Sequence, residues 1–175
     1  MEKGIIICGL NGSGKTTTGR LVAERLGIKR MDVEDYYFLD SEIPFTVSRT
    51  KDEVRELMWA DIQKHKEYVL SSVGCDWGEQ IEGSLALAVF LTAPKETRMA
   101  RIDHREIVRF GDRVLEGGDM YEQKKRFRQF VSGRSEEPYR EQIKKLPCPV
   151  LELDSTQPLD VIVEKICRAY SEITS

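Results

Sequence analysis

The sequence predicts a three-layer α/β/α fold in which helices cover both faces of a five-stranded parallel sheet. Short apolar runs alternate with helical patterns along the whole chain, which is typical of parallel strands joined by crossover helices. The 175 residues contain no internal repeat, no low-complexity stretch and no linker rich in Pro, Gly or Ser. We therefore expect one domain, residues 1–175, built on a single sheet.

The first strands and the helix between them have clear signals. Residues 4–8 contain three isoleucines in succession, as expected for a strand that is buried on both faces. A helix is expected over 14–26, and Gly27 stands where its C-terminal stop should be. The second strand, 29–33, ends in a cluster of acidic residues.

The alternation continues through the middle of the chain. Thr50–Glu53 is a capping box, and the residues after it are apolar at helical spacing. The third and fourth strands are expected over 68–73 and 85–91. Pro94 then stands in the first turn of a helix that should end near Val108.

The last third of the chain holds a charged segment and the final strand. Residues 105–118 are charged and contain three glycines, so we expect a mobile loop there. A helix capped by Asp119 and Glu122 follows and reaches about Val131. Residues 150–153 predict the fifth strand, and the closing helix begins near Leu159.

Composition and charge exclude several functions. A net charge of −3 argues against a nucleic-acid partner, because such proteins usually carry a basic excess. No apolar run approaches the roughly 20 residues that span a bilayer, so no membrane partner is expected. The first residues lack the layout of a signal peptide, and the four cysteines lack zinc-ligand spacing and indicate reduced thiols. We expect a cytoplasmic protein.

A phosphate-binding motif is the most specific feature of the sequence. Gly9, Gly14, Lys15 and Thr16 match G-x-x-x-x-G-K-[ST], the P-loop, between a predicted strand and a predicted helix. In this motif backbone N–H groups surround phosphate oxygens, the lysine contacts the β- and γ-phosphates, and the hydroxyl can bind Mg²⁺. No guanine-specificity motif is present, so ATP and Mg²⁺ are expected. The residues expected to bind ATP are Gly9, Asn11, Gly12, Ser13, Gly14, Lys15, Thr16 and Thr17.

With this motif and this order of elements, the sequence resembles the small P-loop kinases of the nucleoside-monophosphate-kinase-like group, which includes adenylate, shikimate and gluconate kinases. The resemblance covers nearly the whole chain. It implies a P-loop NTPase fold with a lid segment, and transfer of a phosphoryl group from ATP to a small-molecule or nucleotide acceptor.

The resemblance also implies roles for residues outside the P-loop. The acidic residue that orients the acceptor would be Asp35 first and Asp32 second, since a carboxylate can accept the proton of a hydroxyl nucleophile. Arg101 would stack on the adenine, and Arg105 would stabilise the transferring phosphoryl group as a catalytic residue together with Lys15 and Asp35. The turn at 153–158 would wrap the adenine through backbone contacts.

The remaining roles concern the lid and the acceptor. Residues 105–118 would form the lid, and residues 36–66 would form the acceptor-binding region. The residues expected to contact the acceptor or an anionic group are Asp32, Arg49, Asp76 and Arg134. Each of these four residues can also be interpreted as a solvated charge or as a helix-capping residue. The basic stretch 123–128 is interpreted as a solvated face.

Two classes of function therefore remain open. The first is an ATP-dependent kinase, in which a separate acceptor pocket lies beside the P-loop. The alternative is a nucleotide-binding regulatory or assembly ATPase with slow hydrolysis and no acceptor. The sequence leaves the acceptor and the oligomeric state open.

Overall fold

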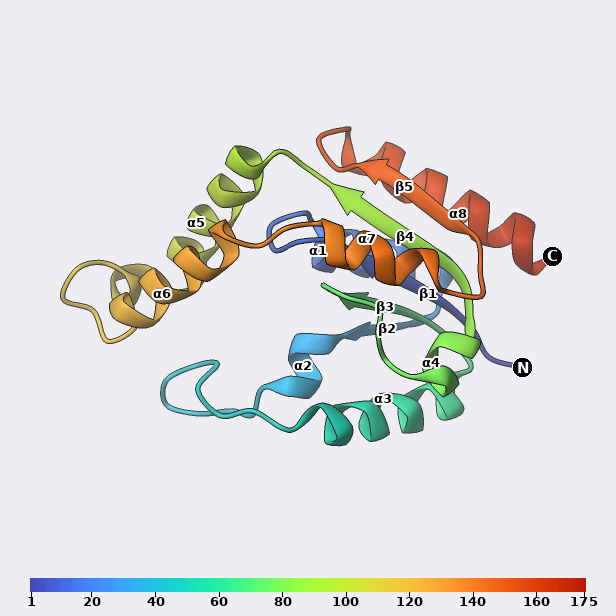
Figure 1. Cartoon of the computed structure of the whole chain (residues 1–175), viewed down its shortest axis with the longest axis horizontal. Helices are drawn as coiled ribbons and strands as arrows, with labels where there is room; N and C mark the ends of the chain where they lie inside the picture. The colour runs from blue at the N-terminus through green and yellow to red at the C-terminus, as the bar shows by residue number, and fades with distance from the viewer.

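The computed structural model describes residues 1–175, which form five strands and eight α-helices (Figure 1). The strands are β1 (Lys3–Cys8), β2 (Lys29–Asp32), β3 (Glu67–Ser72), β4 (Leu85–Thr92) and β5 (Val150–Asp154). The helices are α1 (Lys15–Leu26), α2 (Val33–Tyr37), α3 (Lys51–His65), α4 (Glu79–Gly83), α5 (Lys95–Phe110), α6 (Tyr121–Ser132), α7 (Glu137–Lys144) and α8 (Leu159–Thr174), with a 3₁₀-helix η1 (Gly111–Val114) after α5.

The strands form one parallel sheet in the order β2-β3-β1-β4-β5. The central strand β1 pairs with β3 on one side and with β4 on the other, so that Ile5 lies beside Val69 and Leu87. Because all strands are parallel, their carboxyl ends meet at one edge of the sheet, where open α/β sheets bind ligands. The P-loop follows β1 at the middle of this edge.

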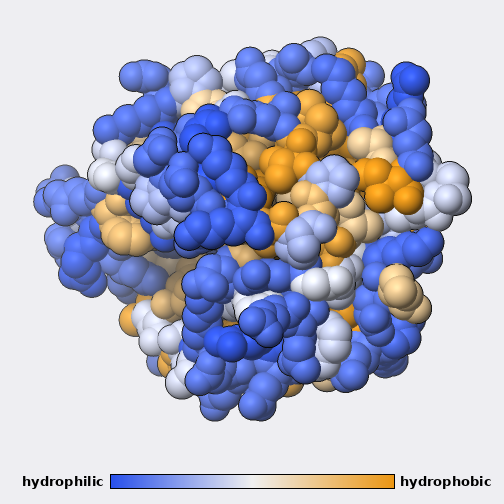
Figure 2. Space-filling model, turned by 45° about the vertical axis from the view of Figure 1, so that its right-hand side comes forward, coloured by the Kyte–Doolittle hydropathy of each residue, from blue (hydrophilic) through white to orange (hydrophobic).

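Helices cover both faces of the sheet, and the predicted three-layer fold is confirmed. On one face Ile6, Leu70 and Phe90 pack in a core with residues of α3, α4 and α7. On the other face Ile5 and Ile7 pack in a core with residues of α1 and α8. Cys8, Cys75 and Cys167 are buried in these cores as small apolar residues. Hydrophilic residues dominate the exterior face drawn in Figure 2, where one apolar area is also exposed.

The predicted helix signals are confirmed at two places. Thr50 and Glu53 form the capping box at the start of α3: Thr50 Oγ1 accepts from the Glu53 amide, and Glu53 Oε2 accepts from the Thr50 amide. Gly27 ends α1 with a φ of +68°, a conformation that favours glycine. At α6, by contrast, the predicted side-chain cap is wrong, because Asp119 pairs with Arg113 and caps no amide.

Helices α5 and α6 project from the sheet as an arm (Figure 1). Met99, Ile102 and Val131 form the small apolar cluster that joins the two helices. The expectation of a mobile loop from residue 105 is wrong for the first part of the segment, because α5 continues to Phe110 and η1 follows it. The turn after η1 is closed by two backbone hydrogen bonds of 2.8 Å, from Gly118 to Leu115 and from Met120 to Arg113. The segment that was expected to be a lid loop is therefore mostly a helical arm.

No helix combines the length and the apolar composition that a membrane span requires.

Candidate functional site

The P-loop connects β1 to α1 and rests on the start of α5. Gly12 has a φ of +81°, and a Cβ atom at this position would lie 2.4 Å from the carbonyl oxygen of Arg98. Only glycine fits so close to that carbonyl group. Gly9 lies below the loop, where a Cβ atom would meet the carbonyl oxygen of Leu91 at 2.5 Å. Glycine therefore serves packing here as well as phosphate binding.

Lys15 folds back over the loop and lies in a partly buried position. Its ammonium group donates a hydrogen bond of 3.1 Å to the carbonyl oxygen of Leu10. Burial lowers the pKa of Lys15 to about 8, although the nearby carboxylates of Asp32 and Glu34 act in the opposite direction. A cation that is desolvated in this way gains from the arrival of an anion, as the P-loop motif requires.

Thr16 and Asp32 join the P-loop to the end of β2. The Thr16 hydroxyl donates a hydrogen bond of 2.7 Å to Asp32 Oδ2. Asp32 is 6% exposed and is also the N-cap of α2, because its Oδ1 accepts from the Glu34 amide at 3.0 Å. Both side chains offer oxygen ligands, which Mg²⁺ prefers. No group of three or more His, Cys, Asp or Glu side chains is placed to form a metal site.

The two aspartates that were expected to orient the acceptor lie in different places, with Asp32 at the P-loop and Asp35 away from it. Asp35, the first choice from the sequence, has a side chain that is 67% exposed and lies 3.8 Å from Arg30. It lines only a small hollow beside the loop after α2. Residues 33–37 form the helix α2, which the sequence analysis did not predict, and this helix turns Asp35 away from the P-loop. Glu34 lies on the side of the P-loop instead. Burial is the larger cause that raises the pKa of Glu34, and the negative charge of Asp32 is the second.

A cavity of about 650 Å³ opens beside the P-loop and beyond Asp32. Helix α2, the loop after it, the end of β3 and the arm form its walls. Its aromatic lining consists of Tyr37, Phe38, Phe45, Trp77, Phe127 and Tyr139. Its cationic lining consists of Lys15, Lys51, Arg105, Arg109, Lys124 and Arg134, against four carboxylates, Asp32, Glu34, Asp76 and Glu106. The excess of positive charge suits an anionic ligand. We refer to this space as the acceptor-side cavity.

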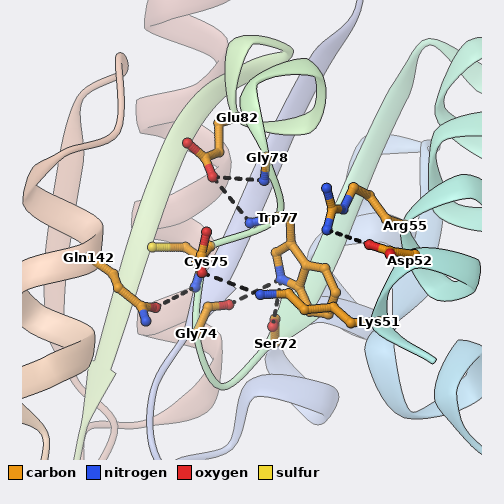
Figure 3. A network of polar contacts seen from close by, with 11 residues as sticks. Lys51, Asp52, Arg55, Ser72, Gly74, Cys75, Trp77, Gly78, Glu82 and Gln142 are labelled. Carbon is orange, nitrogen blue, oxygen red and sulfur yellow. Dashed lines mark hydrogen bonds and ion pairs between the residues drawn. The ribbon is translucent and has the colours of Figure 1, made fainter.

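The wall after β3 is held rigidly around Trp77 (Figure 3). The indole nitrogen donates to Ser72 Oγ at 3.1 Å and to the carbonyl oxygen of Gly74 at 3.3 Å. Glu82 Oε1 accepts from the amides of Trp77 and Gly78 at 3.1 and 2.9 Å. The indole ring is therefore fixed at the edge of the acceptor-side cavity rather than free to turn.

Asp76, next to Trp77, lines the cavity, but its side chain is 69% exposed and lies 3.3 Å from Lys51.

A second hollow of about 530 Å³ lies on the opposite side of the P-loop. Arg101 joins the loop to the turn after β5 there: its guanidinium donates to the carbonyl oxygen of Gly12 at 3.1 Å and to Ser155 Oγ and the Ser155 carbonyl oxygen at 3.0 and 2.9 Å. Gly14 and Thr17 also line this hollow. We refer to it as the base-side cavity.

Two further arginines that the sequence singled out lie at the P-loop. Arg134 donates a hydrogen bond of 2.8 Å to Asn11 Oδ1 and lines the acceptor-side cavity. Arg105 lines both cavities, and its Nε is buried without a hydrogen-bond partner. The structure thus brings Arg101, Arg105 and Arg134 together around residues that lie far from them in the sequence.

Arg49 and Lys124 do not lie where they were expected, whereas Lys125, Arg126 and Arg128 of the basic stretch are exposed, as predicted. Arg49 lines neither cavity, and its guanidinium donates to the carbonyl oxygen of Tyr36 at 2.8 Å, so it stabilises the loop after α2. Lys124 was expected on a solvated face, but its side chain is only 11% exposed. Its ammonium lies 2.8 Å from Glu106 Oε2 and above the rings of Phe45, Phe110 and Phe127. Sequence spacing alone does not reveal that these partners meet.

The parallel sheet, the glycine-rich loop after its central strand and the Lys15–Thr16 pair define a P-loop nucleotide-binding protein. A family model described as "AAA domain" matches residues 5–112, and the chain belongs to this family.

A relative and two solved structures extend this result. The chain is 33% identical over 174 residues to YqaC of Bacillus subtilis (strain 168), an uncharacterized protein, with 95% of this chain and 96% of YqaC covered. A gluconokinase from Sinorhizobium meliloti 1021 has a similar structure, with a TM-score of 0.57 and 16% identity over 97% of this chain and 92% of the gluconokinase chain. An unliganded sugar kinase from Janibacter sp. HTCC2649 gives a TM-score of 0.56 and 16% identity over 99% and 96% of the two chains. These likenesses confirm the P-loop kinase fold.

Proposed function

We propose that this protein is a kinase that transfers the γ-phosphoryl group of ATP to a small-molecule or nucleotide acceptor. One observation carries the proposal: the buried carboxylate of Asp32 contacts the P-loop residue Thr16 and also lines a cavity that extends away from the loop. A protein that only binds nucleotide needs the base-side cavity and the P-loop. A second cavity on the far side of the phosphates is what a two-substrate enzyme requires.

The donor half of the site is proposed to hold ATP across the P-loop. The base would lie in the base-side cavity against the flat face of Arg101, whose edge is already occupied by its bonds to Gly12 and Ser155. The triphosphate would lie on the loop amides and Lys15. Thr16, whose hydroxyl group is oriented by its hydrogen bond to Asp32, would hold Mg²⁺, which when bound offsets the charge of the phosphates.

The acceptor half of the site is proposed to place a hydroxyl group near Asp32. The hydroxyl oxygen forms a bond to the γ-phosphorus while the bond from that phosphorus to the β,γ-bridging oxygen breaks, and ADP leaves. Asp32 takes the proton of the hydroxyl group as the new bond forms. Arg105 and Arg134 lie beside the P-loop, where they would stabilise the negative charge of the transferring group.

The fold likeness supports the same class of reaction, since the two similar structures are a gluconokinase and a sugar kinase. The competing proposal is a regulatory ATPase that binds nucleotide and hydrolyses it slowly. Both proposals include the P-loop, so a variant of Lys15 tests the site but does not separate them.

The deciding experiment is a transfer screen with γ-labelled ATP and Mg²⁺ against nucleotides, nucleosides, sugars and small acids. We expect one class of acceptor to gain label with the wild-type chain and none to gain it with Lys15→Ala. Slow release of inorganic phosphate that no acceptor accelerates, with no labelled acceptor, would favour the regulatory ATPase.

A further inference from the structure

The segment between α2 and α3, residues 38–50, extends from the sheet on the same side as the arm (Figure 1), and Phe38 and Phe45 of this segment line the acceptor-side cavity. We refer to this segment as the acceptor loop. Its base is closed by backbone hydrogen bonds from Leu39 to Val47 at 2.9 Å and from Arg49 to Tyr37 at 2.7 Å. The arm holds the other end of the loop, because Gln123 Nε2 donates to the carbonyl oxygen of Pro44 at 2.9 Å. The loop therefore connects the wall that carries α2 with the wall that carries α6.

Arg113 makes a second contact of this kind. Its guanidinium donates to the carbonyl oxygen of Glu42 at 3.1 Å while it pairs with Asp119 at 2.9 Å. The acceptor loop is thus tied to the arm at two backbone carbonyl groups.

Phe45 lies at the centre of this contact and lines the acceptor-side cavity. The ammonium of Lys124 lies 4.8 Å from the centre of its ring, and the guanidinium of Arg109 lies 5.6 Å from it. Both are cation–π distances. The ring also meets Phe38 and Phe110 edge-to-face, with centroids 5.1 and 6.1 Å apart. The ring of Phe45 therefore contacts Phe38 of the loop and Phe110 of the arm, and so joins the two walls.

The backbone of Phe45 shows that these contacts hold it in an unfavourable conformation. Its φ is +65°, a value that a bulky residue adopts only when its surroundings impose it. The positive φ marks Phe45 as a strained position that the ring contacts to Lys124 and Arg109 stabilise.

We propose that Phe45 is the gate residue of the acceptor-side cavity. While its ring lies between Lys124 and Arg109, the loop and the arm are joined and water is kept from the phosphates. The acceptor enters by displacing the ring, and the loop closes again behind it. The part of this inference that concerns phosphates rests on the proposed function, whereas the opening of the loop does not.

The opening of the acceptor loop is tested by amide hydrogen exchange on the full chain without nucleotide. The amides of Leu39 and Arg49 report opening, since each is hydrogen-bonded across the base of the loop. In Phe45→Ala we expect these amides to exchange about tenfold faster than in the wild type. Phe45→Tyr keeps the ring and should restore slow exchange. Val47→Ala is the matched control, because Val47 is in the same loop, 45% exposed, and lines neither cavity.

The effect on the phosphates is tested with Mg·ATP and with water as the acceptor. Release of inorganic phosphate should rise severalfold in Phe45→Ala, because the open cavity admits water, and should stay at the wild-type rate in Val47→Ala. ATP affinity should change little, since Phe45 does not line the base-side cavity.

Two outcomes would contradict the proposal that Phe45 is the gate residue. The first is wild-type exchange at Leu39 and Arg49 in Phe45→Ala, and the second is phosphate release no faster than in Val47→Ala. Failure of the proposed function is distinguishable from both, because it would show as no labelled acceptor in the transfer screen with the wild type or any variant, while the exchange contrast would persist.

Discussion

The hydroxyl group of Thr16 donates a hydrogen bond of 2.7 Å to Asp32 Oδ2, although β1 and β2 are not neighbours in the sheet. The contact is possible because α1 begins above β3, the strand between them, where Ser71 Oγ donates to the carbonyl oxygen of Lys15 at 3.1 Å. Thr16 at the start of α1 therefore reaches the end of β2. This contact joins the phosphate-binding loop to the acceptor-side cavity.

Replacing Asp32 by Asn is expected to lower the rate of phosphoryl transfer by about 10²–10⁴-fold, the typical effect of losing a general base. The protein should still fold, because Asn is as good an N-cap for α2 as Asp. Asp35→Asn is the matched control, and its exposed side chain predicts a change of less than about twofold. Steady-state transfer rates measure both, and a larger loss in Asp35→Asn would show that the assignment of Asp32 is wrong.

The affinity for ATP should depend on the charge of Lys15. Burial lowers the pKa of Lys15 to about 8 in the free protein, whereas a bound triphosphate favours the charged form. Affinity should therefore be constant well below pH 8 and fall as the pH rises through about 8, because the free protein must then take up a proton to bind. Calorimetric titration between pH 6.5 and 9.5 measures this. Lys15→Arg stays charged and should lose the dependence, and a pH-independent wild type would contradict the prediction.

Gly12→Ala and Gly27→Ala separate backbone strain from steric clash. Both glycines have a positive φ, but a Cβ atom on Gly27 meets nothing within 4 Å, whereas one on Gly12 lies 2.4 Å from a backbone oxygen. We expect Gly27→Ala to cost about 1 kcal/mol, or about 2–4 °C in melting temperature. Gly12→Ala should cost about 1–3 kcal/mol more and abolish ATP binding. Equal melting temperatures for the two variants would contradict the close approach of α5 to the P-loop.

Arg101→Gln should weaken the binding of ATP more than that of inorganic tripolyphosphate. The side chain lines the base-side cavity, and tripolyphosphate has no base to place there. We expect a loss of about tenfold for ATP, equivalent to about 1.4 kcal/mol, and a smaller loss for tripolyphosphate. Competition titrations with the two ligands measure the difference. Equal losses would indicate that Arg101 acts only by supporting the P-loop through the carbonyl group of Gly12.

Lys124→Met should destabilise the chain, because it leaves the buried carboxylate of Glu106 with only the more distant Arg105, 3.8 Å away, as its partner. The two side chains are 11% and 10% exposed, and breaking a buried pair typically costs about 3–5 kcal/mol. The double variant Lys124→Met with Glu106→Leu should recover most of this loss. Denaturant unfolding measures the free energies. A cost near zero for Lys124→Met would show that the pair is solvated, as the sequence alone suggested.

Much of the fold could be predicted because its signals are local. The isoleucines of β1, the capping box at Thr50 and the stop at Gly27 are each set by a few neighbouring residues. The short helices α2, α4 and α7 were missed, since none has enough turns to show a clear periodicity. The charged segment from residue 105 was expected to be a loop, yet no helix-ending residue occurs in α5 before Gly111.

The sequence by itself predicted the parallel sheet and the phosphate-binding loop, because the apolar runs and the P-loop motif are patterns of residues that are adjacent in the chain. Only the tertiary structure decided that Asp32 rather than Asp35 faces the loop, that Arg49 stabilises a backbone turn, and that Lys124 lies in an aromatic cage. These outcomes depend on which way a short helix turns and on which distant side chains meet it. The spacing of residues along the chain does not contain that information.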